Sequence, residues 1–140
     1  MTYTISRDTN IVSVIVTDMV TLQDCVCSVD GLLAEGVLEP GMQLLIDATS
    51  IKPELSFSDL HNLVWHVQRL VRGGLSSIAI IATSDFVYGL ARTFCTHADL
   101  QGFNVGAFRT SQKALMWLES CRPAICSSIR SNTLPGGELP

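Results

Sequence analysis

The sequence contains few charged residues and no excess of positive charge. Only 16% of its 140 residues are charged, and the formal net charge is −4 at pH 7. Nucleic-acid-binding surfaces draw much of their affinity from lysine and arginine side chains that face the phosphates, so this balance argues against a nucleic-acid partner. The chain is 47% hydrophobic with a mean hydropathy of +0.35. Its small charged fraction therefore favours elements buried on both faces, as in a parallel sheet flanked by helices.

Long apolar runs and export signals are also missing from the sequence. No apolar run reaches the roughly 18 residues that a membrane-spanning helix requires, so we expect no membrane span. The first ten residues, MTYTISRDTN, lack the charged start, apolar centre and small-residue cleavage site of a signal peptide. The five cysteines are an odd set without a small-domain disulfide framework. Together these features indicate reduced thiols and a cytoplasmic location.

Motifs of catalysis and cofactor binding are absent as well. There is no G-x-G-x-x-G or G-x-x-x-x-G-K loop and no G-x-S-x-G nucleophile elbow. His61 and His66 are five residues apart on a predicted helix, so they do not share a face, and we do not expect His97 to converge with them. Cys25 and Cys27 point to different faces of another predicted helix. We therefore expect a protein that is not an enzyme, with no cofactor, no metal site and no disulfide.

The hydrophobic pattern predicts one α/β domain. Two β-rich runs, residues 3–6 and 11–16, flank a polar tetrad typical of a hairpin turn, so the first pair of strands should be antiparallel. Helical and strand patterns alternate after this hairpin, which predicts parallel strands joined by right-handed crossovers. The expected fold is a single-domain sandwich with a mixed sheet of about five strands and about four helices, the sheet being covered on both faces. The later predicted elements are a helix capped by Thr21, strand 43–47, helix 57–72, strand 77–82, a helix capped by Thr83 or Ser84, strand 103–108 and a helix capped by Thr110 or Ser111.

The predicted domain covers residues 1–121, and residues 122–140 form a C-terminal extension. This extension contains prolines and two adjacent glycines and shows no hydrophobic period. Since it cannot build a core of its own, we expect it to lie on the domain or on a second subunit.

Asp47 ends the predicted strand 43–47, at the edge of the sheet where open α/β folds bind ligands. A receiver domain would place its phosphoacceptor aspartate here. However, only Asp18 is available as a second acidic residue and no lysine follows the last strand, so Mg²⁺ would have too few ligands. We instead assign Asp47, together with Phe57, to a candidate ligand cleft between the sheet and helix 57–72.

Three serines, Ser50, Ser56 and Ser58, lie in the hydroxyl-rich segment that leads into helix 57–72. A serine at such a position usually caps the helix, and we expect Ser56 or Ser58 to do so. A helix N-terminus also stabilises a bound phosphate, and a phosphoserine there would alter a binding surface. The three serines therefore mark a candidate regulatory or phosphorylation loop.

Trp65 lies off the apolar stripe of helix 57–72 and beside Arg69 and Arg72. An aromatic ring with cationic neighbours is either a surface decoration held by cation–π contact or an anchor of an interface, where tryptophan and arginine are enriched. We expect these three residues to form an interaction surface for a protein partner or for a second copy of the chain in a homodimer.

The order and spacing of the predicted elements resemble those of a STAS domain, and more closely those of the SpoIIAA-like family. The resemblance covers residues 2–120. It is carried by the strand LLID at 44–47, the serine-rich entry to the next helix, strand 78–82 and the closing segment FRTSQKALMWL at 108–118. The resemblance implies a non-catalytic module. Antagonists of anti-sigma factors with this fold are switched off by phosphorylation in an Asp-Ser-Ser-Gly-Leu motif. The nearest match here, SFSDL at 56–60, has Phe57 at the acceptor position, so we expect no efficient phosphorylation.

Two functions remain open at this point. The first is a regulatory or adaptor domain that acts through protein–protein contact. The alternative is a carrier or sensor that binds an apolar small molecule or lipid beside helix 57–72, because the SpoIIAA-like branch is similar in shape to the lipid-carrying CRAL-TRIO domains. A filled core with an exposed Trp65 would favour the first function, and an apolar cleft with few polar groups would favour the second.

Overall fold

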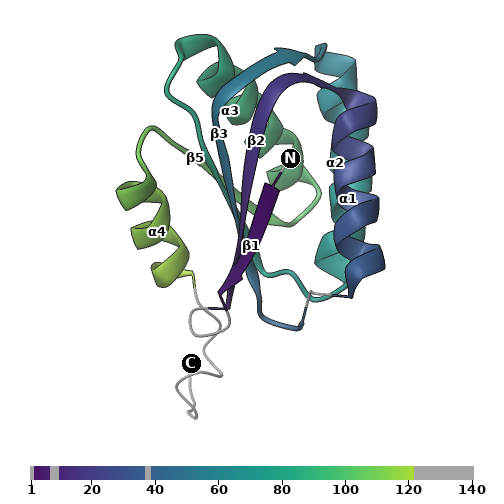
Figure 1. Ribbon diagram of the computed structural model, residues 1–140, viewed down its shortest axis with the longest axis vertical. Coiled ribbons are helices and arrows are strands. Elements are labelled where there is room, and N and C mark those ends of the chain that lie inside the picture. Colours follow the sequence, from purple (N-terminus) through teal and green to yellow (C-terminus); the bar gives the residue numbers. More distant parts are fainter. Residues whose placement is uncertain (1, 7–9, 37–38, 122–140) are drawn as a thin grey trace.

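The computed structural model describes residues 2–6, 10–36 and 39–121. Five strands form one sheet in the order β1-β2-β3-β4-β5, in which β1 is antiparallel to β2 and all other neighbours are parallel (Figure 1). Four helices follow the later strands in the described residues, so the predicted mixed α/β sandwich is confirmed. The elements are β1 (Thr2–Ser6), β2 (Ile11–Thr21), α1 (Leu22–Glu35), β3 (Gln43–Glu54), α2 (Phe57–Arg72), β4 (Ser77–Ile81), α3 (Asp85–Leu100), β5 (Asn104–Phe108) and α4 (Ser111–Ser120).

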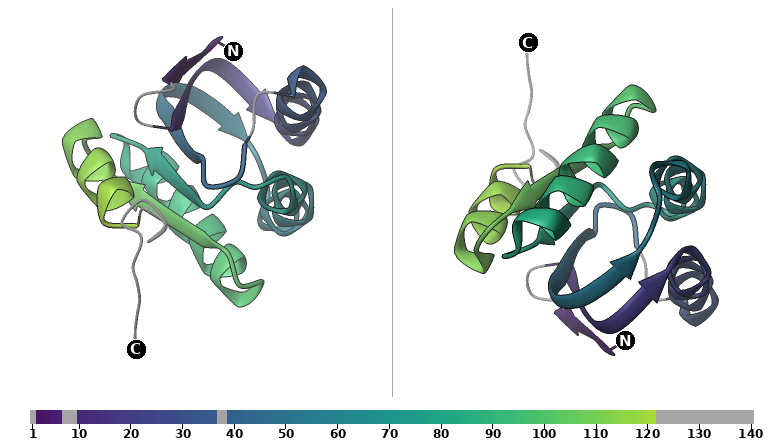
Figure 2. Two further views of the ribbon diagram at one scale, coloured as in Figure 1. Left: turned by 90° about the horizontal axis from the view of Figure 1, so that it is seen from below. Right: turned by 90° about the horizontal axis from the view of Figure 1, so that it is seen from above.

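The helices are divided unequally between the two faces of the sheet. Figure 2 shows α1, α2 and α3 side by side on one face and α4 alone on the other. The larger core lies under the three helices, and its most buried members include Val12, Leu44, Val64, Leu70 and Ile78. A smaller core lies under α4, where Ala114 and Leu118 pack on β4 and β5. None of the helices in the described part of the chain is long and apolar enough to cross a membrane.

Both faces of the sheet carry helices, as expected, but α4 covers its face only in part. Ile15 of β2 points to the α4 side of the sheet, as Ile11 does, yet 48% of its surface is exposed. A helix with its side chains is about 10–12 Å wide, while neighbouring strands lie about 4.8 Å apart. The single helix α4 packs mainly on β4 and β5 and therefore cannot cover all five strands.

Helix starts follow the predicted capping residues. The Thr21 hydroxyl and the Asp24 carboxylate form a complete capping box at α1, and Ser56 and Asp59 form another at α2. Ser84 caps α3, and Thr110 caps α4 in the same way. These side chains satisfy backbone N–H groups that have no partner within the first helical turn.

Strand β3 is longer than predicted, because it continues through Pro53 to Glu54 instead of ending at Asp47. Its pairing with β4 covers only residues 43–47. Beyond that point β3 pairs with β2 alone, so its other edge is open and tolerates a proline. The paired ends of β2 and β3 arch over toward the ends of α1 and α2 (Figure 1).

Candidate functional site

An apolar cavity lies between the sheet and the helices α1, α2 and α3. Its volume is about 460 Å³, within the range of small-molecule sites. The floor is formed by apolar side chains of β2, β3 and β4, among them Val14, Leu44, Ile46, Ile78 and Ile80. The roof is formed by apolar side chains of the three helices, among them Val29, Leu32, Leu60, Leu63, Val67, Leu90, Ala91 and Phe94.

Two central-strand residues show that this cavity is open to solvent. Ile46 on β3 and Ile80 on β4 both pack toward the helices, yet each is only partly buried. Apolar residues in the middle of a sheet covered by helices are normally buried completely. Their partial exposure indicates that the helices do not fill the space above them.

The polar part of the cavity wall lies at the start of α1. Thr17, Asp24 and Cys27 line the cavity and are exposed, and Ser28 beside them is partly buried. Partly buried apolar side chains of the segment 51–55, which pairs with the end of β2, also line the cavity. The exposed polar side chains therefore form a polar rim around an apolar interior.

A β-bulge produces the arch. Between the pairs Ile15–Asp47 and Thr17–Ser50, β3 advances by one residue more than β2. The Asp47 Oδ1 atom accepts hydrogen bonds from the Thr49 N–H at 3.0 Å and from the Thr49 hydroxyl at 2.7 Å, which holds the extra residue in place. A bulge of this kind bends the strand and increases its twist. The second half of β3 is thereby carried toward the helices and becomes a wall of the cavity.

The two residues assigned to the cleft from sequence, Asp47 and Phe57, do not line this cavity. Asp47 shares the face of β3 with Leu45, which packs in the core under α4, so its side chain is on the other side of the sheet. Phe57 is 70% exposed at the start of α2. Leu55, two residues before Phe57, lines the cavity instead and packs against the larger core.

Cys25 contributes a thiol to the cavity wall. Burial, followed by the negative charges of Asp24 and Asp59, raises the pKa of this thiol from 9.0 to about 11. It is therefore protonated at neutral pH and acts as a small apolar group, because only the thiolate is a good nucleophile. The four described cysteines, Cys25, Cys27, Cys95 and Cys121, are all free. The fifth, Cys126, lies outside the described residues.

The three serines of the predicted regulatory loop do not lie in one loop. Ser56 is the cap of α2: its Oγ accepts from the Asp59 N–H at 3.1 Å, and its own N–H donates to Asp59 Oδ2 at 2.9 Å. Ser58 follows in the first turn of the helix, while Ser50 belongs to strand β3 and pairs with Thr17. The polar pattern after Asp47 resembles a loop because one edge of β3 is open there.

Trp65 is 53% exposed on the outer side of α2, and Arg72 is exposed as well. Arg69, in contrast, turns toward α1. Its Nη2 lies 2.8 Å from Asp30 Oδ1 on α1 and 3.3 Å from His66 Nδ1 on its own helix. The predicted surface of Trp65, Arg69 and Arg72 is thus divided, because Arg69 is already engaged with α1.

Two of the three histidines, which we expected to lie apart, are in contact. The rings of His61 on α2 and His97 on α3 lie edge to face with their centroids 5.5 Å apart, so the prediction that they stay apart is wrong. The two helices pack side by side, and this tertiary contact is not visible in the spacing of either helix. Within residues 2–6, 10–36 and 39–121, no three His, Cys, Asp or Glu side chains gather as a metal site would require.

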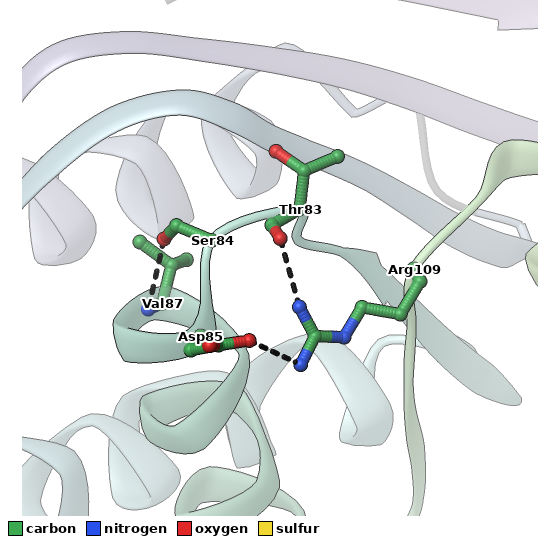
Figure 3. Close-up of polar contacts among 5 residues, drawn as sticks. All are labelled: Thr83, Ser84, Asp85, Val87 and Arg109. Carbon is green, nitrogen blue, oxygen red and sulfur yellow. Dashed lines mark hydrogen bonds and ion pairs between the residues drawn. The ribbon is translucent and has the colours of Figure 1, made fainter.

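Arg109, which the sequence did not single out as a site residue, organises the carboxyl ends of β4 and β5 (Figure 3). Its Nη1 donates to the Thr83 carbonyl at 2.8 Å, and its Nη2 donates to Asp85 Oδ1 at 2.9 Å. The guanidinium group also lies 4.1 Å from the centroid of the Tyr88 ring. The one feature of the sequence that could have pointed to Arg109 is its position directly after strand β5. These contacts fasten the end of β5 to the start of α3, and Arg109 does not line the cavity.

Comparison with known proteins gives one informative likeness. No family model matches the chain, and no curated protein matches it in sequence. The structure is similar to that of an uncharacterised protein from the DUF3478 family of Shewanella loihica PV-4, described as having a SpoIIAA-like fold. The TM-score is 0.55 and the identity 19%, over 84% of this chain and 92% of that chain. The chain therefore has the SpoIIAA-like fold that its resemblance to STAS domains predicted.

Proposed function

We propose that the protein is a non-catalytic carrier or sensor that binds an apolar small molecule or lipid in the cavity beneath α2. The observation that carries the proposal is the apolar cavity of about 460 Å³ with a polar rim at the start of α1. A pocket with an apolar interior and few polar groups holds a ligand mainly by removing its apolar surface from water. The protein would then report or deliver the ligand without changing it.

A binding role is also favoured by the chemistry of the cavity wall. Its interior side chains are apolar, and the Cys25 thiol is kept protonated by a pKa of about 11. Among the described lining residues there is no histidine, lysine or arginine to serve as a proton carrier or charge stabiliser. The cytoplasmic location expected from the sequence is part of this proposal.

The proposal is tested by filling the cavity. N-phenyl-1-naphthylamine, an uncharged probe that fluoresces in apolar surroundings, should bind the wild-type protein. Ala91 lines the cavity from α3, so Ala91→Phe places a ring inside it and should weaken binding by about tenfold or more. Ala34→Phe is the matched control, because Ala34 is exposed on α1 and does not line the cavity. Its affinity for the probe should equal that of the wild type.

Circular dichroism of both variants checks that they are folded, and Val16→Phe provides a second filled cavity if Ala91→Phe does not fold. Val16 is a partly buried lining residue of β2, so its neighbours leave room for a larger side chain. A wild-type protein that does not bind the probe, or a folded cavity variant that binds it as well as the wild type, would contradict the proposal.

A second candidate function is contact with a further copy of the chain through α2. It is favoured by the 53% exposure of Trp65, since an exposed tryptophan is a typical interface anchor. The regulatory or adaptor role expected from the sequence would act through this surface.

A further inference from the structure

We infer that the cavity selects an amphiphile whose head group donates hydrogen bonds and carries no negative charge, such as an alcohol or an amine, over a carboxylate of the same chain. This inference rests on the proposed function and adds the chemical class of the ligand. It follows from the carboxylate of Asp24 and the acceptor oxygen of Ser28 in the rim, and from the absence of cationic side chains among the described lining residues. The Thr17 hydroxyl can accept as well as donate, so it does not oppose this choice.

Asp24 brings a carboxylate to the rim of the cavity. Its Oδ2 is used within the capping box, where it accepts from the Thr21 N–H at 3.0 Å and from the Thr21 hydroxyl at 3.1 Å. No hydrogen bond among the described residues uses its Oδ1, and the side chain is exposed while lining the cavity. A ligand head group at this rim therefore meets a carboxylate oxygen that can accept one more hydrogen bond.

Ser28 adds a second acceptor, one turn further along α1. Its hydroxyl already donates to the Asp24 carbonyl at 2.9 Å. A hydroxyl has a single hydrogen to donate, so toward a ligand the Ser28 oxygen is available as an acceptor. Both polar groups thus match a head group that donates hydrogen bonds.

The negative field of Asp24 and Asp59 reaches the interior of the cavity. These two residues occupy the third position of α1 and of α2, and both carboxylates act on the Cys25 thiol in the cavity wall, where they help to raise its pKa. A carboxylate at the place of that thiol would experience the same repulsion. An ammonium group would be attracted.

Two basic side chains that are next to lining residues in the sequence are turned away or already paired. Lys52 stands between Ile51 and Pro53, which line the cavity, so strand alternation directs the lysine to the opposite face. Arg69 is paired with Asp30 on the outer side of α1 and α2. An anionic head group would therefore enter without a partner, and burying an unpaired charge is costly.

The cavity admits a ligand of moderate length. Its volume of about 460 Å³ lies within the range of about 300–1,000 Å³ found for small-molecule sites. We therefore choose a dodecyl chain for the test.

The test compares three ligands that share this chain. Dodecanol, dodecylamine and dodecanoate are titrated at neutral pH, below their aggregation concentrations, into the wild-type protein loaded with N-phenyl-1-naphthylamine. Dodecanol and dodecylamine should displace the probe with inhibition constants at least about tenfold lower than that of dodecanoate. Equal displacement, or a preference for dodecanoate, overturns the inference on the head group and leaves the proposed function standing. Failure of all three to bind, measured directly by calorimetry, overturns both.

Two substitutions assign the selectivity to the rim. Asp24→Asn removes the charge but keeps an oxygen that can accept from the Thr21 N–H, so the helix cap is retained. It should improve the affinity for dodecanoate severalfold and weaken that for dodecylamine, with dodecanol little changed. Asp99→Asn is the matched control, because Asp99 is an exposed residue of α3 that does not line the cavity. An unchanged ratio of acid to amine in folded Asp24→Asn, or the same change in Asp99→Asn, would refute the assignment.

Discussion

Asp47 and Thr49 hold the bend of β3 through two hydrogen bonds, 3.0 Å and 2.7 Å long, to the same carboxylate oxygen. We expect Asp47→Ala to lower the free energy of unfolding by about 1 kcal/mol, the net value of such bonds at a partly exposed site. Asp47→Asn keeps an acceptor oxygen and should lose less. Urea unfolding measures both. Asp47→Ala should also weaken probe binding, since the bend carries a wall of the cavity, and a variant with unchanged stability would show that the bulge does not need the carboxylate.

Arg109 should stabilise the fold through its geometry and not through its charge alone. Arg109→Ala removes the contacts with Thr83, Asp85 and the Tyr88 ring, and we expect the midpoint of thermal unfolding to fall by roughly 3 °C, which corresponds to about 1 kcal/mol for a domain of this size. Arg109→Lys should restore little, because an ammonium group cannot make the forked contacts. Lys113→Ala, at an exposed site on α4, serves as the control and should leave the midpoint unchanged. If Arg109→Lys had the same midpoint of thermal unfolding as the wild type, the positive charge alone would explain the stabilisation.

The helices could be predicted from sequence because their ends are encoded locally. The bounds of α2 were predicted residue for residue, since Ser56 and Asp59 cap its start and Gly73 follows its end. Strand β3 was predicted too short for a related reason. Its second half is exposed on one edge, carries polar residues and contains Pro53, so it lacks the apolar pattern from which a buried strand is recognised.

The cavity itself could not be predicted from the sequence. It is the space that the side chains of several packed elements leave unfilled, and no single segment specifies it. Asp47 was assigned to the cleft as the end residue of a strand, but the strand continues and the alternation of side chains turns Asp47 to the other face. The bulge that produces the arch depends on the register of β2 against β3, which no local pattern specifies. The contact of His61 with His97 is a tertiary feature of the same kind.

Two adjacent glycines should respond differently to alanine. Gly74 has φ +119°, and a Cβ there would lie 2.8 Å from the Pro40 Cα, so Gly74→Ala meets both backbone strain and a clash with backbone atoms. We expect a loss of more than about 1 kcal/mol in the free energy of unfolding. Gly73 has φ −77° and its nearest neighbour would be the Leu70 carbonyl at 3.4 Å, so Gly73→Ala should be close to neutral. Equal effects of the two substitutions would contradict the geometry at the end of α2.

Stability should fall at alkaline pH because of two partly buried thiols. Burial is the main cause that raises the pKa of Cys25 and of Cys95 from 9.0 to about 11. The folded state thus holds these protons more tightly than the unfolded state. The free energy of unfolding is unaffected by the thiols below about pH 9 and decreases as the pH rises toward 11. The double variant Cys25→Ala, Cys95→Ala should show a shallower decline than the wild type in urea unfolding across this range, and identical slopes would show that the thiols titrate normally.

Trp65 provides the test of self-association. Burying the exposed half of this side chain against a second copy would remove roughly 100 Å² of mostly apolar surface from water on each chain, and a symmetric pair would bring the same patch of both chains together. If α2 forms such an interface, sedimentation of the wild type gives a dimer, and Trp65→Ala shifts the mass toward the monomer with an unchanged far-UV circular dichroism spectrum. Phe86→Ala is the matched control, because Phe86 is an exposed aromatic residue, 64% accessible, on the neighbouring helix α3. A monomeric wild type, or the same loss of mass in both variants, would exclude the interface at Trp65 and leave the cavity as the functional feature of the fold.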